Sequence, residues 1–492
     1  MPEFHIEHFG CRAARADGEA VGGRLRAAGL DEGHPSAADV VVVNTCSVTA
    51  EADRAARAFI RRTHRLNPEA RIVVTGCYAQ RAPEELAAMP GVAAVVGNSH
   101  KALAPEIALG LAHQPDPSGD AIPAPHSNLV TLQSLLAAGA PGSAPIWADD
   151  HFAHSFIEEA QLVPGEQTRP NLKIQEGCGN RCTFCVIPQT RGASKSLPRA
   201  AVMRQVEGFI AAGGNELVLS GINLGRWGWD LPASEGQPRA TLAGLTRQIL
   251  QNTQLSRLRL SSIEPMDWNA DLIALLAEFG GTRLARHAHL PLQSGSDAVL
   301  RRMHRRYRPW HYAQKVETLL KAAGPELTLG ADVMVGFPGE TDAEFEETVA
   351  LIRALPFGYL HLFPFSPRPE TRGWALHAAS PVAPQAVEER MVALRTLAAE
   401  KSKSHWARFI GRELDAITLH TPPALARKNR TSALTENFLP VEIDGLLPAN
   451  RLLRVRISGL NAEGTLEAIE AGMPSPSPEV LIHSSRPLWQ SV

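Results

Sequence analysis

Three cysteines, Cys178, Cys182 and Cys185, stand in one short segment near the middle of the chain, GCGNRCTFC. Their spacing is C-x3-C-x2-C. Three thiolates in one short loop can hold three irons of a cubane [4Fe–4S] cluster and leave the fourth iron open. A structural zinc ion is the alternative, but it needs a fourth Cys or His nearby, and none follows at zinc-finger spacing. The segment therefore predicts an iron–sulfur site with one open iron.

The other three of the six cysteines, Cys11, Cys46 and Cys77, are single and far apart in the sequence. Each follows an apolar run that predicts a strand, and these runs are Phe4–His8, Asp39–Val43 and Arg71–Thr75. In open α/β sheets, ligands lie beyond the carboxyl ends of the strands. We therefore expect these cysteines to converge on one point, whereas unrelated buried thiols would have no reason to share this placement.

The elements that position the cysteines fall into three regions. In the first, the strands alternate with helices over Asp17–Ala28 and Ala50–Arg65, and a further strand is expected over Val92–Val96, which predicts a mostly parallel sheet. The second region has six candidate strands with helices such as Arg199–Ala212 and Ala343–Ala354 between them, which predicts an open or partial β/α barrel. Those strands are Leu172–Gln175, Glu216–Ser220, Arg257–Ser261, His287–Leu290, Leu327–Val335 and Gly358–Leu362. In the third region, short strands over Glu413–Leu419, Phe438–Ile443 and Leu452–Ile457 predict a small β-barrel.

The expected fold class is thus α/β with an added β-barrel. We expect an N-terminal cluster domain over 1–112, a Pro-rich linker or insertion over 113–168, a central domain over 169–400, a β-barrel over 401–470 and a tail over 471–492.

Composition narrows the class of protein. The 492 residues are 44% hydrophobic and 20% charged, which is enough apolar material for several cores and excludes a disordered chain. No run is long and apolar enough for a transmembrane helix, and the start MPEFHIEHFG lacks the pattern of a signal peptide. We therefore expect a cytoplasmic protein without a membrane partner. The net charge of −2 means that any nucleic-acid binding needs local basic patches.

The C-x3-C-x2-C segment, with Phe184 before its last cysteine, resembles the signature of the radical S-adenosylmethionine (SAM) superfamily. The resemblance implies that SAM chelates the open iron and that one electron cleaves it to methionine and a 5′-deoxyadenosyl radical. It also implies that residues at the barrel mouth bind SAM. The candidates are Phe184 in the cysteine segment, Gly213, Gly214 and Glu216 as a Gly/Glu segment, Glu264, Gln293 in HLPLQSGS and Asp332 in GADVMVGFPGE.

The segments GCRAARADGEA, NTCSVTAEADR and TGCYAQR around the single cysteines resemble the cluster-binding domain of the methylthiotransferases. The resemblance covers nearly the whole chain and implies a second [4Fe–4S] cluster on Cys11, Cys46 and Cys77, and an RNA-associated TRAM-like C-terminal barrel. Departures from the family pattern are Ala14 in place of Asn, Glu370 in place of Gly, and the long segment 113–168.

NTCSVTAEADRAARAFIRR and LKIQEGCGNRCTFCVIPQTRG most resemble the branch that acts on N6-threonylcarbamoyladenosine next to the tRNA anticodon. The resemblance implies a transferase that converts C2–H of this nucleoside, at position 37, to C2–S–CH3, with SAM as radical source and methyl donor. It implies an electron donor such as flavodoxin or ferredoxin, while the sulfur donor stays open.

Several other functions remain open at this point. The substrate could be isopentenyladenosine tRNA or an aspartate of a ribosomal protein. The chain could also be a non-catalytic RNA-binding protein with structural zinc, or an electron-transfer protein, although three ligands at each site disfavour the latter.

Three basic runs are candidates for contact with tRNA phosphates. The first is on the helix after Cys46, the second is near the barrel mouth, and the third is in the terminal barrel. Their residues are Arg54, Arg57, Arg61, Arg62 and Arg65; Arg301, Arg302, His304, Arg305, Arg306 and Arg308; and Arg427, Lys428 and Arg430.

Overall fold

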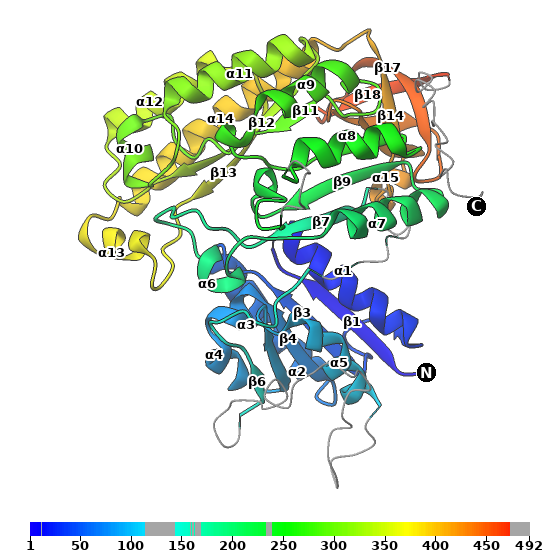
Figure 1. Ribbon diagram of the computed structural model, residues 1–492, viewed down its shortest axis with the longest axis vertical. Coiled ribbons are helices and arrows are strands. Elements are labelled where there is room, and N and C mark those ends of the chain that lie inside the picture. The colour runs from blue at the N-terminus through cyan, green and yellow to red at the C-terminus, as the bar shows by residue number, and fades with distance from the viewer. Residues whose placement is uncertain are drawn as a thin grey trace, which may run out of the picture.

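The computed structural model describes residues 1–10, 12–113, 143–157, 159, 162, 169–232 and 239–472. Cys11 and the predicted tail from residue 473 onward lie outside the described residues. Figure 1 shows three regions: the N-terminal sheet at the bottom, the central strands and helices above it, and a small barrel at the upper right. The short helix α6 (Ile187–Arg191) lies where the lower and upper regions meet.

The N-terminal region is a six-stranded parallel sheet in the order β2-β1-β3-β4-β5-β6. Its strands are β1 (Glu3–His8), β2 (Asp31–Glu32), β3 (Val40–Thr45), β4 (Arg71–Gly76), β5 (Val92–Gly97) and β6 (Ile146–Trp147). Its helices are α1 (Arg12–Ala27), α2 (Ala50–Leu66), α3 (Cys77–Arg81), α4 (Pro83–Ala87), η1 (Lys101–Leu103) and α5 (Ala104–Ala112). The prediction of a parallel α/β sheet is confirmed.

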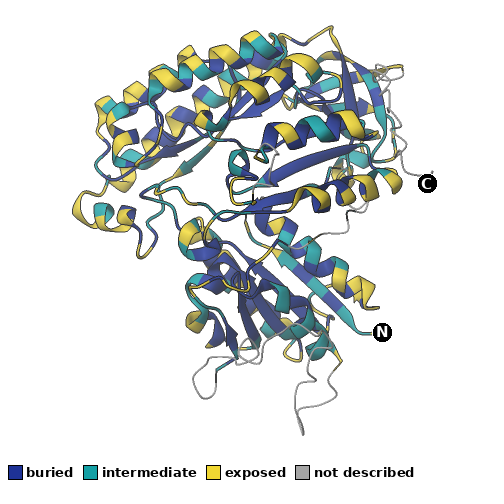
Figure 2. Ribbon diagram, viewed as in Figure 1, coloured by how far each residue is buried: buried dark blue, intermediate teal, exposed yellow. Residues whose placement is uncertain are grey.

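The four consecutive valines of β3 explain why this sheet is covered on both faces. Val40 and Val42 pack with α1 and α5, whereas Val41 and Val43 pack with α2, α3 and α4. Successive side chains of a strand point to opposite faces, so an unbroken apolar run needs helices on both sides. All four valines are buried, as the dark strands of Figure 2 illustrate.

Strand β6 changes one expectation about the linker. Residues 113–168 were expected to connect two domains, but Ile146 and Trp147 pair with β5 and complete the first sheet. Both side chains are buried against the sheet's two apolar clusters. A two-residue strand carries no periodic pattern of its own, so only tertiary contacts reveal it.

The central region consists of two sheets, in the orders β10-β9-β7-β8 and β11-β12-β13. All neighbours are parallel except β8, which runs antiparallel to β7. The strands are β7 (Asn171–Glu176), β8 (Lys195–Ser196), β9 (Glu216–Gly221), β10 (Arg257–Leu260), β11 (His287–His289), β12 (Thr328–Val335) and β13 (Phe357–Pro364). Besides α6, the helices are α7 (Arg199–Ala211), η3 (Leu224–Arg226), α8 (Leu242–Asn252), η4 (Pro265–Asp267), α9 (Ala270–Phe279), α10 (Asp297–Arg302), α11 (Pro309–Ala323), α12 (Asp342–Ala354), α13 (Arg372–Ala379) and α14 (Pro384–Ala407).

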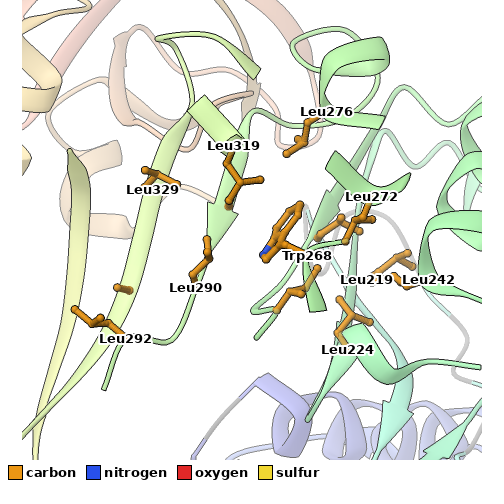
Figure 3. Close-up of a cluster of buried hydrophobic side chains, with 14 of the residues drawn as sticks. Leu219, Leu224, Leu242, Trp268, Leu272, Leu276, Leu290, Leu292, Leu319 and Leu329 are labelled. Atoms are coloured by element: carbon orange, nitrogen blue, oxygen red, sulfur yellow. The ribbon is translucent and has the colours of Figure 1, made fainter. Parts of the chain in front are cut away.

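One apolar core joins the two central sheets into the expected partial barrel. Trp268 is fully buried between them, with Leu219 and Leu272 on one side and Leu290 and Leu319 on the other (Figure 3). Burying aromatic and leucine side chains of this size stabilises the fold by about 2–3 kcal/mol each. The core thereby holds the strand ends, and the loops that follow them, in fixed positions.

The C-terminal region is a closed barrel in the order β14-β15-β16-β18-β17. Its elements are β14 (Glu413–Thr418), α15 (Pro423–Ala426), β15 (Arg430–Thr435), β16 (Pro440–Asp444), β17 (Leu452–Leu460) and β18 (Leu466–Gly472). The prediction of a small β-barrel is confirmed.

The C-terminal barrel closes the floor of the central barrel. Its Glu436 forms an ion pair with Arg286 at 2.5 Å, and Phe438 stacks on His287 with ring centroids 4.2 Å apart. Phe438 also lies under the guanidinium of Arg259, at 5.2 Å from its ring. Phe438 therefore lies between the two barrels. No helix among the described ranges has the length and hydropathy to cross a membrane.

Candidate metal and cofactor sites

The open cysteine site, which we define as Cys178, Cys182 and Cys185, lies in the loop after β7. All three residues line one cavity of about 520 Å³. A second cavity of about 370 Å³ also reaches Cys182 and is lined in addition by Glu264 and Arg305. The loop begins at Gly177, where φ is +68° and a Cβ would lie 2.0 Å from the Ala193 carbonyl oxygen. Only glycine fits such a turn.

Nitrogen donors surround the sulfur atoms of the open cysteine site. The side-chain amide of Asn223 donates to Cys178 Sγ at 3.4 Å, and the Arg305 guanidinium donates to Cys182 Sγ at 3.3 Å. Burial raises the pKa of the Cys185 thiol to about 12. Such a thiol stays protonated in the free protein and becomes an anion on binding a metal ion, which replaces the proton. Three free thiols at one cavity, with N–H donors aimed at sulfur, fit an iron–sulfur cluster with one open iron.

The enclosed cysteine site, which we define as Cys46 and Cys77, lies at the carboxyl end of the N-terminal sheet. Thr45 of β3 pairs with Gly76 of β4, so Cys46 and Cys77 directly follow the ends of neighbouring strands. Each is only 3% exposed. Cys11 lies outside the described residues, but its neighbour Gly10 is so close to Cys46 that a Cβ there would lie 2.7 Å from the sulfur.

Two donors from different regions reach the sulfur of Cys77. Asn98 Nδ2, after β5, donates to it at 3.4 Å, and Arg191 Nε, at the end of α6, donates at 3.2 Å. The same Asn98 amide donates to the Thr190 carbonyl at 2.8 Å. Both cysteines are free thiols. The enclosed site therefore fits a thiolate-bound cluster as well, and it lies against the central region.

Four of the residues predicted to bind SAM lie on or directly after the central strands or the cysteine loop. Phe184 packs against the central core beside Cys185. Glu264, after β10, accepts a hydrogen bond from Arg305. Asp332, on β12, lies between His289 at 3.1 Å and His361 at 3.2 Å, and these contacts hold the pKa of its carboxyl well below the ordinary value despite burial.

Gln293 is held in a costly conformation after β11. Its φ is +63°, a region that non-glycine residues rarely adopt, and it is 7% exposed. Its side-chain oxygen is buried and has no hydrogen-bond partner among the described residues. A buried, unpaired acceptor on a strained residue is typical of a ligand-binding position.

The Gly/Glu segment does not reach the cysteines, so its prediction as a SAM-binding segment is wrong. Gly213 and Gly214 form the tight turn that ends α7, and Glu216 begins β9. The cysteine loop follows the opposite, carboxyl end of the neighbouring strand β7. Glu216 is fully buried and forms an ion pair with Arg259 at 2.9 Å. The letters of the motif match, but the direction of the strand places them at the wrong end of the sheet.

The residue after β9 that does contact the cysteines is Asn223, which the sequence reasoning missed. Arg305 was expected to contact tRNA phosphates, but it is 7% exposed and is bound to Glu264 and Cys182. Asn98 and Arg191 were also missed. Asn223 stands three residues after the predicted strand Glu216–Ser220, and polar residues directly after strands were the available signal. Arg191 offers no such signal, because its contact spans 114 residues.

Comparison with known proteins follows the same division of the chain. The model of "Uncharacterized protein family UPF0004" matches residues 3–97, and that of the "Radical SAM superfamily" matches residues 172–352. A radical SAM methyltransferase, TsrM, from Kitasatospora setae has a similar fold, with a TM-score of 0.52 at 15% identity over 74% of this chain and 75% of that one.

Relatives over nearly the whole length are more informative. The chain is 31% identical to the threonylcarbamoyladenosine tRNA methylthiotransferase MtaB of Rickettsia prowazekii, over 94% of this chain and 96% of the relative. It is 33% identical to the protein of the same name from Bacillus subtilis, over 90% of both chains. A tRNA-2-methylthio-N6-dimethylallyladenosine synthase of Sorangium cellulosum is 34% identical over 75% of this chain and 73% of the relative. The two relatives that match nearly the full length are both named for the threonylcarbamoyladenosine tRNA branch. The chain therefore belongs to the radical SAM methylthiotransferase family of enzymes.

Proposed function

We propose that the protein converts N6-threonylcarbamoyladenosine at position 37 of tRNA to its 2-methylthio derivative, replacing C2–H by C2–S–CH3. The observation that carries the proposal is the pair of separate cysteine sites, one open to cavities and one enclosed, on either side of α6. Full-length similarity to relatives named for this substrate supports the choice of nucleoside.

In this proposal, Cys178, Cys182 and Cys185 hold one [4Fe–4S] cluster, and Cys11, Cys46 and Cys77 hold the other. When bound, the first cluster would supply the electron that cleaves SAM to the radical, and the second would supply sulfur. The chain's own residues orient these groups. Arg305 and Asn223 fix two sulfur atoms of the open site, while Arg191 and Asn98 fix Cys77.

We place SAM at the mouth of the central barrel, bounded by Glu264, Gln293 and Asp332, with Phe184 behind the cysteine loop. The unpaired oxygen of Gln293 provides an acceptor for a ligand N–H or O–H. Glu264 and Arg305 line the smaller cavity beside Cys182, where the Arg305 guanidinium is paired with the Glu264 carboxylate. Gly213, Gly214 and Glu216 are excluded from this site by their position at the opposite end of β9.

The tRNA backbone is proposed to lie along α2, which follows Cys46. Arg54, Arg61 and Arg65 are exposed there and have no carboxylate partner in the described part of the chain. In the other two basic runs most cations are paired: Arg302 with Glu344 at 2.7 Å, for example. Phosphates bind where positive charge is not already neutralised. A tRNA substrate places the enzyme in the cytoplasm, with a flavodoxin- or ferredoxin-like protein as electron donor.

Nucleoside mass spectrometry of tRNA from cells with and without the gene tests this proposal. We expect 2-methylthio-N6-threonylcarbamoyladenosine to disappear in the deletion strain, its unthiolated precursor to accumulate, and the normal profile to return on complementation. Loss of the 2-methylthio derivative of isopentenyladenosine instead would transfer the assignment to the branch of the Sorangium relative. An unchanged tRNA profile would contradict a tRNA substrate and direct the search to methylthiolated aspartate in ribosomal proteins.

A further inference from the structure

A group of five buried charged side chains lies where the N-terminal and central regions meet. We call it the interface charge cluster; it comprises Asp17 of α1, Lys101 of η1, Lys173 and Glu176 of β7, and Arg191 of α6. The side chains of Lys101, Lys173, Glu176 and Arg191 are all at most 7% exposed, and that of Asp17 is 15% exposed. Both regions contribute to it, so it exists only when they are docked.

Within this cluster every cation contacts both carboxylates. Arg191 lies 3.0 Å from Asp17 and 2.5 Å from Glu176. Lys101 and Lys173 each contact the same two side chains. Each carboxylate therefore has three cationic neighbours, an arrangement that fits two ionised carboxylates.

The interface charge cluster contains three cations and two anions, and it therefore carries one positive charge in excess. A further anion nearby stabilises a buried group of side chains with net positive charge. Arg191 reaches such a position, because its Nε donates to Cys77 Sγ at 3.2 Å. A neutral thiol does not balance the charge, whereas an iron-bound thiolate does.

We propose that Arg191 tunes the cluster held by the enclosed cysteine site, raising its reduction potential. The inference rests on the proposed function, because it requires a cluster on Cys77. Adding an electron makes an iron–sulfur cluster more negative, and an N–H donor with net positive charge behind it stabilises that reduced state. Arg191 is a positioning residue in this account, since it acts through the sulfur ligand.

The open cysteine site provides the matched comparison. Arg305 donates to Cys182 in the same way, but its charge is neutralised by Glu264. Each arginine therefore acts on one site only, and the influence of each can be measured separately in a chain that holds one cluster.

The test uses the full-length chain with Cys178, Cys182 and Cys185 replaced by Ala, loaded with iron and sulfide without oxygen. Electron paramagnetic resonance of samples poised at a series of potentials gives the midpoint potential of the remaining cluster. We expect Arg191→Met to make the cluster at least tenfold harder to reduce at fixed potential, which is a shift of about 59 mV to more negative values for one electron. Arg305→Met in the same background is expected to leave the potential unchanged.

A second variant tests the sign of the effect. Glu176→Gln adds one more unit of net positive charge to the interface charge cluster, so the potential is expected to move in the opposite direction. If Arg191→Met retains no iron, the potential measured in Glu176→Gln tests the proposal alone. An intact iron–sulfur signal whose potential does not change in either variant overturns the role of Arg191 and leaves the proposed function standing. A triple-alanine chain that binds no iron–sulfur cluster overturns the assignment of the enclosed site itself.

Discussion

The two cysteine sites use similar polar partners in different surroundings. Each has one arginine and one asparagine donating to sulfur: Arg305 with Asn223 at the open site, and Arg191 with Asn98 at the enclosed site. The open site lines a cavity of about 520 Å³, whereas Cys46 and Cys77 are 3% exposed. We infer that the open site has room for a small cosubstrate, whereas packing around Cys46 and Cys77 restricts access to the enclosed site.

The largest expected effect comes from removing one cysteine of each site. Cys182→Ala is expected to abolish both 5′-deoxyadenosine formation and methylthiolation. Cys77→Ala is expected to abolish methylthiolation but to retain reductive cleavage of SAM, because the open site is intact. Each variant should lose about four irons per chain. Chromatography of 5′-deoxyadenosine and nucleosides, with iron analysis, measures these outcomes.

Equal loss of SAM cleavage in both cysteine variants would contradict different roles for the two sites, provided that the circular dichroism of each variant matches that of the parent chain. Retained methylthiolation in either variant would contradict the assignment of that site. Cys→Ser at the same positions serves as a control of similar volume.

The buried carboxylate of Glu216 lies away from both cysteine sites. A change at this residue therefore tests the stability of the fold without changing either cluster site. Burial opposes ionisation of Glu216, but the positive charges of Arg259, Arg257 and Arg169 outweigh it and lower its pKa to about 2. Because the folded-state pKa lies below the ordinary value of 4.5, this carboxylate stabilises the fold at neutral pH. The contribution, a few kcal/mol, is lost as the pH falls below about 4.5 toward 2.

We therefore expect Glu216→Gln to lower the free energy of unfolding at about pH 6, and the difference from the parent chain to narrow at about pH 3. Urea unfolding of the metal-free chains at the two pH values measures this. Reconstituted Glu216→Gln should hold the same amount of iron as the parent chain. A difference that widens on acidification would contradict the ion-pair account.

The smallest expected effect concerns tRNA affinity beside the enclosed site. Arg61→Ala with Arg65→Ala is expected to weaken tRNA binding several-fold. The slope of log K against log salt is expected to fall by about one for each phosphate that the variant no longer neutralises. Lys428→Ala is the control, since Lys428 is already paired with Glu463 at 2.6 Å. Filter binding at several salt concentrations measures both. Equal weakening by Lys428→Ala would shift the proposed RNA path toward the C-terminal barrel.

Local sequence patterns predicted most strands and helices correctly. The functional residues that the sequence did not reveal are those whose contacts join distant parts of the chain. The four consecutive valines of β3 predict a strand that is buried on both faces, and the spacing of the C-x3-C-x2-C loop predicts a metal site. Glu216 was wrongly expected at the SAM site, because a short motif does not indicate at which end of a strand it lies. Arg191 was missed because its partner sulfur belongs to another region of the chain, and no periodicity links the two.

The contact between the central barrel and the C-terminal barrel limits how these two regions can be exchanged for other domains. Phe438 and Glu436 belong to the C-terminal barrel in sequence, yet they complete the packing around His287 and Arg286. A chimera that exchanged the C-terminal barrel for an unrelated RNA-binding module would leave an aromatic face and a guanidinium open to water. We therefore expect the central and C-terminal regions to keep their packing only when they are exchanged together.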